Sequence, residues 1–268
     1  MKKLLLLLPL DALARCSLNR TTAKVTSGVV DAGLPAVFSQ ADPQYVKEAL
    51  PANLQLMEIL LASDPGNKKM LVNAAQGFCG YGFMFLEEDQ PERASFFYLK
   101  GQAYAERALR GATAETAQKK DAHPLFWHTF CKALYMNINR DKPEAIAEIP
   151  SLEPAALKLL ELDPGYYYNA AHDIMGAYYA IRPRMLGGNP EKAAEHFELA
   201  LTGHGADFHL SRFLYAKMAA VAAQDGELFE RLLNEIISAE LKDGDTRLAN
   251  EVAKLKAKKL LEKKDELF

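Results

Sequence analysis

Cysteine and histidine are the residues that could carry nucleophilic or metal chemistry here, and their spacing favours neither. Cys79 and Cys131 lie within apolar helical stretches, and no base is placed to activate either thiol. We expect both to be buried, and in an oxidising compartment they could form a disulfide. His123 and His128 are five residues apart, which is not the spacing of two metal ligands on one helix face. The sequence predicts no enzyme, no metal site and no cofactor.

A glycine-rich segment at residues 77–82 does not have the pattern of a nucleotide-binding loop. A dinucleotide fingerprint follows a strand, and no strand precedes these glycines. Glycine also allows one backbone to approach another closely. We therefore interpret the segment as a site of close packing between helices.

The N-terminus has the pattern of an export signal, with lysines after Met1 and an apolar run to Leu10. A cysteine just after such a run resembles the acylated cysteine of bacterial lipoproteins, so we predict a lipid on Cys16. Ser17 favours the outer membrane. Arg15 is unusual in this position, which leaves ordinary secretion or a retained N-terminus as alternatives. We expect a signal peptide at 1–16, a tether and docking segment at 17–40, and a single helical repeat domain at 41–268.

Aromatic side chains gather on particular stretches and are the candidates for ligand binding. Most should belong to the core. Helical repeats, however, present their first helices on a concave face, where surplus aromatic residues can line a groove for an apolar ligand. An arginine nearby could add a positive rim. The candidate groove or pore residues are Phe83, Trp127, Tyr167, Tyr178, Tyr179 and Arg182.

The elements that must position these residues are helices. Ala and Leu supply 80 of 268 residues, whereas Val, Ile and Thr supply 24. This balance favours helices over strands and predicts an all-α protein. The last helix should span about 246–262, with Lys254, Lys256, Lys258 and Lys259 on its solvated face. A net charge of −3 makes nucleic acid an improbable partner.

The chain also contains an internal duplication of about 99 residues. Helix starts and stops recur at this offset, which predicts a tetratricopeptide-like superhelix of stacked helix pairs. Gly77 and Gly176 should be the small residues on the first helix of each pair, against which the second helix packs. The matching positions are Pro51 and Pro150, Leu60–Leu61 and Leu159–Leu160, Asp64–Gly66 and Asp163–Gly165, Gly77 and Gly176, and Pro91–Glu92 and Pro190–Glu191.

Two segments carry a resemblance to a known family. They are Tyr178–Leu201, which includes the glycine-rich turn before Asn189, and Arg247–Phe268. Both resemble the T component of tripartite ATP-independent periplasmic (TRAP) transporters, and the likeness extends over about residues 35–268.

This resemblance implies an all-helical periplasmic lipoprotein. Members of the family are expected to form a homotrimer with a pore-like passage in each protomer. They would dock the transporter's extracytoplasmic solute-binding protein and handle a small hydrophobic organic ligand, and they have no catalytic residues to carry over. The alternative is a non-catalytic scaffold lipoprotein of the bacterial envelope that uses its helical repeats only for protein docking.

Overall fold

The computed structural model describes residues 10–268, with side chains from residue 20 onward. Within this part of the chain every regular element is a helix, which confirms the all-α prediction. The longer helices are α1 (Leu10–Phe38), α2 (Pro43–Ser63), α3 (Lys68–Tyr81), α4 (Pro91–Leu109), α5 (Ala122–Ile138), α7 (Leu152–Leu162), α8 (Tyr166–Ala180), α9 (Pro190–Ala200), α12 (Gly226–Ser238) and α13 (Arg247–Leu261).

Shorter elements join or extend these helices. Two are π-helical turns, η1 (Gly82–Leu86) after α3 and η6 (Tyr215–Ala220) after α10. The other short α-helices are α6 (Pro143–Ala147), α10 (His209–Leu214), α11 (Val221–Ala223) and α14 (Lys264–Leu267). The 3-10 turns are η2 (Lys119–Asp121), η3 (Ile149–Ser151), η4 (Arg184–Leu186) and η5 (Gly203–Gly205).

Helix starts are fixed by local capping. The side chain of Asp42 accepts hydrogen bonds from the first backbone N–H groups of α2, and Asn67, Asn189 and Asp225 do the same for α3, α9 and α12. Each such cap stabilises its helix by about 1 kcal/mol. Proline occupies the first turn of α2, α4 and α9, where its missing N–H is not needed.

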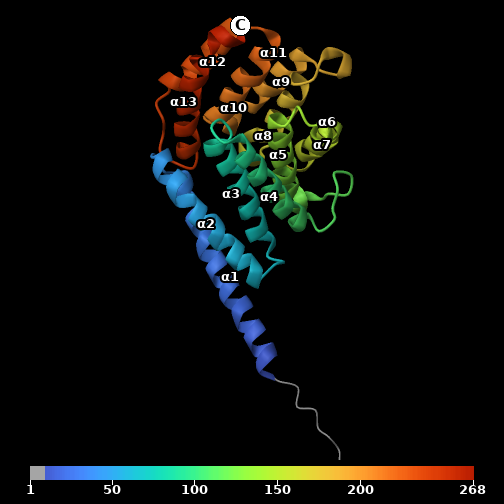
Figure 1. Ribbon diagram of the computed structural model, residues 1–268, viewed down its shortest axis with the longest axis vertical. Coiled ribbons are helices and arrows are strands. Elements are labelled where there is room, and N and C mark those ends of the chain that lie inside the picture. Colours follow the sequence, from blue (N-terminus) through green and yellow to red (C-terminus); the bar gives the residue numbers. More distant parts are fainter. Residues whose placement is uncertain (1–9) are drawn as a thin grey trace, which may run out of the picture.

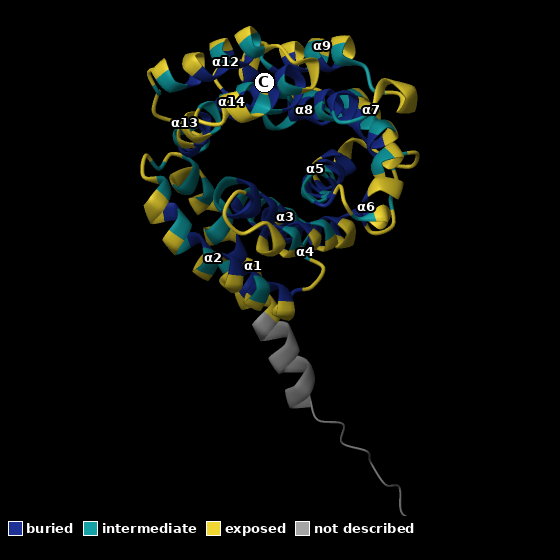
Figure 2. Ribbon diagram, turned by 45° about the horizontal axis from the view of Figure 1, so that its top comes forward, coloured by how far each residue is buried: buried dark blue, intermediate teal, exposed yellow. Residues whose placement is uncertain are grey.

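Helices α1 and α2 run alongside each other (Figure 1), and the view in Figure 2 shows the helices arranged in a ring. Helices α3 and α4 lie on one side of the ring and α8 and α9 on the opposite side. Helix α5 packs against both α4 and α7 and joins the two sides at one end. At the other end α13 packs against α1, α2, α10 and α12.

Residues 17–40, expected to be a tether and docking segment, are largely helical. Helix α1 covers them almost to their end and packs against α2, α3 and α13. Ala23 and Ser27 are buried there, and the guanidinium of Arg20 lies 2.9 Å from the carboxylate of Asp64. Residues 1–9, most of the expected signal peptide, lie outside the described part, as does the side chain of Cys16. The division into domains stays a prediction.

Glycines mark the closest approaches between helices. A Cβ atom on Gly176 of α8 would lie 2.7 Å from the ring of Phe197 in α9, as the interlocking-pair prediction requires. Gly77 does not play the corresponding part, because it faces Leu54 of the preceding helix, α2. Gly82 instead lies against Tyr98 of α4, since a Cβ atom added to it would come within 2.7 Å of the ring. Although α4 and α9 begin 99 residues apart, at Pro91 and Pro190, the duplication stays a prediction.

A disulfide joins Cys79 of α3 to Cys131 of α5. Both residues are fully buried, and the sequence alone leaves their pairing open. Gly101 of α4 lies directly beside this bond, since a Cβ atom there would come within 2.3 Å of the Cys79 sulfur. The bond therefore links α3 to α5 at a point where α4 lies beside it and has a glycine, Gly101, instead of a residue with a side chain.

We predict that Gly176→Ala destabilises the protein by about 1–3 kcal/mol, because the added methyl group overlaps a fully buried Phe197 ring that has no free space to enter. Gly28→Ala is the matched control. Gly28 lies inside α1 with no atom within 4 Å of its added Cβ, so this change should be neutral or slightly stabilising. Urea denaturation followed by circular dichroism measures both. Equal midpoints for the two variants would show that the α8–α9 contact is not tight.

Candidate functional site

A left-handed turn at the start of α8 positions two tyrosines. Tyr167, Tyr168 and Asn169 have φ angles of 48°, 60° and 64°. This conformation is costly for residues with a side chain and often occurs at functional sites. The side-chain amide of Asn169 supports the turn by donating a hydrogen bond of 2.7 Å to the backbone carbonyl of Thr202. Both tyrosine rings consequently lie on the wall of a cavity.

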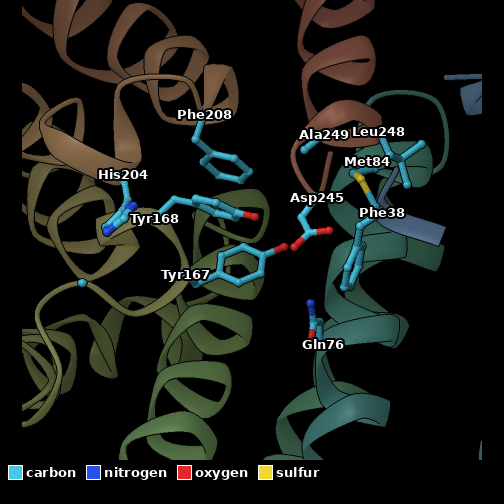
Figure 3. Close-up of a pocket in the computed structure, with 11 residues that line it drawn as sticks. Phe38, Gln76, Met84, Tyr167, Tyr168, His204, Phe208, Asp245, Leu248 and Ala249 are labelled. Atoms are coloured by element: carbon cyan, nitrogen blue, oxygen red, sulfur yellow. The ribbon is translucent and has the colours of Figure 1, made fainter. Parts of the chain in front are cut away.

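This main cavity has a volume of about 370 Å³ and lies between α3, α8 and α13 (Figure 3). Tyr168 stacks on Phe208 with 4.5 Å between the ring centroids. Figure 3 shows Tyr167 and Asp245 extending toward each other from opposite walls. The lining residues are Phe38, Gln76, Met84, Gly165, Tyr167, Tyr168, His204, Phe208, Asp245, Leu248 and Ala249.

A smaller inner cavity of about 30 Å³ adjoins the main cavity, with which it shares Met84, Tyr167 and Phe208 as wall residues. Aromatic rings dominate its walls. Trp127 meets Tyr167 edge to face at 4.8 Å, and its indole N–H donates a hydrogen bond of 3.0 Å to the Tyr166 hydroxyl. The lining residues are Gly80, Phe83, Met84, Trp127, Phe130, Tyr167, Ala170, Asp173, Phe208, Leu210 and Leu214.

Asp173 is the polar exception in the inner cavity. Its side chain is buried, with 3% exposure of the residue. One carboxylate oxygen, Oδ2, accepts a hydrogen bond of 2.6 Å from the Ser211 hydroxyl of α10. The other oxygen, Oδ1, has no hydrogen-bond partner among the described residues. Burial raises the pKa of Asp173 to about 7, since the charged form loses its hydration.

The π-helical turn η1 separates the inner cavity from a third, charged cavity of about 530 Å³. Met84 lies on the walls of all three cavities. We expected Lys256 on a solvated helix face, and this prediction is wrong. Its ammonium is buried 2.8 Å from the Glu88 carboxylate and 5.1 Å from the ring centre of Phe83. Burial lowers the pKa of Lys256 against the opposing effect of Glu88.

The structure divides the candidate groove residues into two groups. Phe83, Trp127 and Tyr167 meet on the walls of the inner cavity. The hydroxyls of Tyr178 and Tyr179 instead donate hydrogen bonds of 3.0 Å each to the two carboxylate oxygens of Glu153.

Arg182 belongs to this second group, because its guanidinium lies 3.5 Å from the ring centre of Tyr178. The second group is thus a packing cluster between α7 and α8, away from the walls of the three cavities. Sequence reasoning missed Tyr168, Phe208 and Asp173. Tyr168 belongs to three consecutive tyrosines at residues 166–168, and this run was a signal that could have identified it. A single aspartate within a helix gave no such signal for Asp173.

A family model described as the TRAP transporter T-component matches residues 39–268. The chain belongs to this family. The matched range holds every residue of the T-component's cavities except Phe38. An uncharacterized protein of Treponema pallidum (strain Nichols) is 26% identical over 274 residues, which cover 85% of this chain and 83% of that protein. Among the described residues, none of the T-component's helices is long and apolar enough to cross a membrane.

We predict that Asp173 makes the stability of this T-component fall as the pH rises. Its pKa in the folded protein, about 7, is above the ordinary value of 3.8, so the folded state holds the proton more tightly. The free energy of unfolding should therefore fall by about 4 kcal/mol as the pH rises from about 4 to 7. Asp173→Asn should remove this decrease. Urea denaturation from pH 4.5 to 8 measures the difference between variant and wild type.

Asp243→Asn is the control, because the side chain of Asp243 is 97% exposed and forms an ion pair with Arg247 at the surface. Its curve should run parallel to that of the wild type across the same range. A difference between Asp173→Asn and wild type that stays constant with pH would contradict the assignment of a raised pKa to Asp173.

Proposed function

We propose that this protein is the periplasmic accessory subunit of a TRAP transporter, and that it handles a small hydrophobic organic ligand and docks the extracytoplasmic solute-binding protein. Membership of the T-component family gives the association with a transporter. The ligand and the partner are the parts that we add.

The proposal that the protein handles a ligand rests on one observation, the adjoining main and inner cavities inside the ring of helices. The main cavity, about 370 Å³, lies within the usual range for small-molecule sites. Aromatic rings from η1, α5 and α8 line the pair, and such walls favour an apolar guest. The left-handed turn at Tyr167–Asn169 directs two of these rings onto the cavity wall, and a backbone conformation of this cost also supports a site rather than a packing defect.

Exposed apolar side chains support the docking part. Tyr45 and Ile59 on α2 are 58% and 57% exposed, and Phe96 on α4 is 59% exposed. Large apolar side chains on a surface favour a protein partner where they form a contiguous patch. Docking to a solute-binding protein and assembly as a homotrimer both follow from the family resemblance. A scaffold lipoprotein would use these outer faces alone and leave the cavities without a role.

The periplasmic location is part of the same proposal. The disulfide between Cys79 and Cys131 supports it, because such bonds persist in oxidising compartments. Acylation of Cys16 would attach the protein to the membrane through an N-terminal lipid, with the outer membrane favoured.

Fluorescence of Trp127 tests ligand handling directly. Trp127 is the only tryptophan of the chain and lies on the inner-cavity wall, so its emission reports on this site. We predict a saturable emission change on titration with 1-octanol. Tyr167→Ala should weaken binding roughly tenfold, since it removes a ring that contacts Trp127.

Tyr178→Ala is the matched control, because it removes a tyrosine from the same helix that points to Glu153 instead. Its affinity for 1-octanol should equal that of the wild type. The absence of any saturable change in the wild-type protein would contradict ligand handling and favour the scaffold alternative.

A further inference from the structure

We propose that the inner cavity receives the ammonium group of a primary amine with an apolar tail, and that Oδ1 of Asp173 accepts a hydrogen bond from this group. The inference rests on the proposed ligand-handling function and names the chemical class of the ligand. The apolar tail would extend past Met84 and Tyr167 into the main cavity, because these residues belong to the walls of both cavities.

The first argument is the unpaired carboxylate. A buried carboxylate without a positive partner is costly, so such groups are normally paired. Ser211 satisfies only one oxygen of Asp173. A donor that enters the cavity can satisfy the other.

The cations of the surrounding helices are already paired with other groups. Arg212 of α10 forms an ion pair with the Glu235 carboxylate at 3.2 Å, and its Nη1 lies 2.9 Å from Nδ1 of His209, although its buried Nε has no hydrogen-bond partner among the described residues. Lys217 of η6 pairs with Glu87 at 2.8 Å, and Lys256 of α13 pairs with Glu88 at the same distance. No described side chain donates a hydrogen bond to Oδ1 of Asp173, so a ligand that enters the cavity can supply the cationic donor.

The second argument is the wall around Asp173. Aromatic ring faces attract cations, most strongly where water is excluded. The cavity volume of about 30 Å³ exceeds the ~10–15 Å³ that one water needs, so an ammonium group fits where a ring does not. The aromatic walls are Phe83, Trp127, Phe130, Tyr167 and Phe208.

The third argument is the charge along the route. The walls of the main and inner cavities contain two carboxylates, Asp245 and Asp173, and neither lysine nor arginine among their described residues. Figure 3 shows Asp245 directed into the main cavity. Burial raises the pKa of Tyr167 and of Tyr168, so both phenols are neutral at physiological pH. At pH 8, above the pKa of Asp173, the negative charge on these walls favours a cation and repels a carboxylate ligand.

The test compares three probes of equal chain length, 1-octylamine, 1-octanol and octanoate, by Trp127 fluorescence at pH 8. We expect 1-octylamine to bind at least roughly tenfold more tightly than 1-octanol, and octanoate to bind least. Asp173→Asn should weaken 1-octylamine roughly tenfold and leave 1-octanol within about twofold. Asp243→Asn, an exposed aspartate, should change neither.

Two results would overturn the inference while leaving ligand handling intact. The first is equal binding of 1-octanol and 1-octylamine by the wild type, and the second is an equal loss of both probes in a folded Asp173→Asn variant. If no probe binds, the proposed function fails as well. If Asp173→Asn does not fold by circular dichroism, the ranking of the three probes on the wild type decides alone.

Discussion

At several glycines, neighbouring helices in this protein approach so closely that no side chain fits between them. The arrangement of the helices in a ring depends on these close contacts. At Gly176 a single methyl group would overlap the buried Phe197 ring of α9. Gly101 leaves room for the disulfide that joins α3 to α5. Because tightly packed interiors do not absorb extra atoms, these contacts fix the spacing of the helices on both sides of the ring. The position of the cavity walls follows from that spacing.

Cavity shape and cavity chemistry have separate origins. The shape depends on irregular backbone, namely the left-handed turn at Tyr167–Asn169 and the π-helical turn η1 that carries Phe83 and Met84. The chemistry depends on Asp173, which lies in a regular part of α8 and is held by one hydroxyl of α10. In this T-component the arrangement of the helices therefore sets the position of the cavities, and individual side chains set the chemistry of their walls.

The sequence alone predicts much of this fold. Ala and Leu content predicts the helices, and residues such as Asn189 and Pro190 predict where they begin, because capping is a local interaction. The three consecutive left-handed residues and the long-range pairing of Tyr178 with Glu153 could not be predicted, since both depend on contacts that only the tertiary structure supplies.

The candidate site shows the same limit. Aromatic type selected Phe83, Trp127 and Tyr167, which line the inner cavity, but it could not separate them from Tyr179, which is also aromatic and largely buried and lies outside that cavity. Lys256 was misplaced because one turn of a lysine-rich helix happens to face Glu88. Burial of a charge is a property of the neighbouring helices, and a single sequence does not contain their positions.

Native mass spectrometry of the purified protein together with the solute-binding protein of its proposed transporter tests the central claim most directly. The account predicts an oligomer that binds the solute-binding protein and releases a small organic molecule when it is dissociated in the gas phase. A protein that stays monomeric, ignores the solute-binding protein and carries no small molecule would contradict the account.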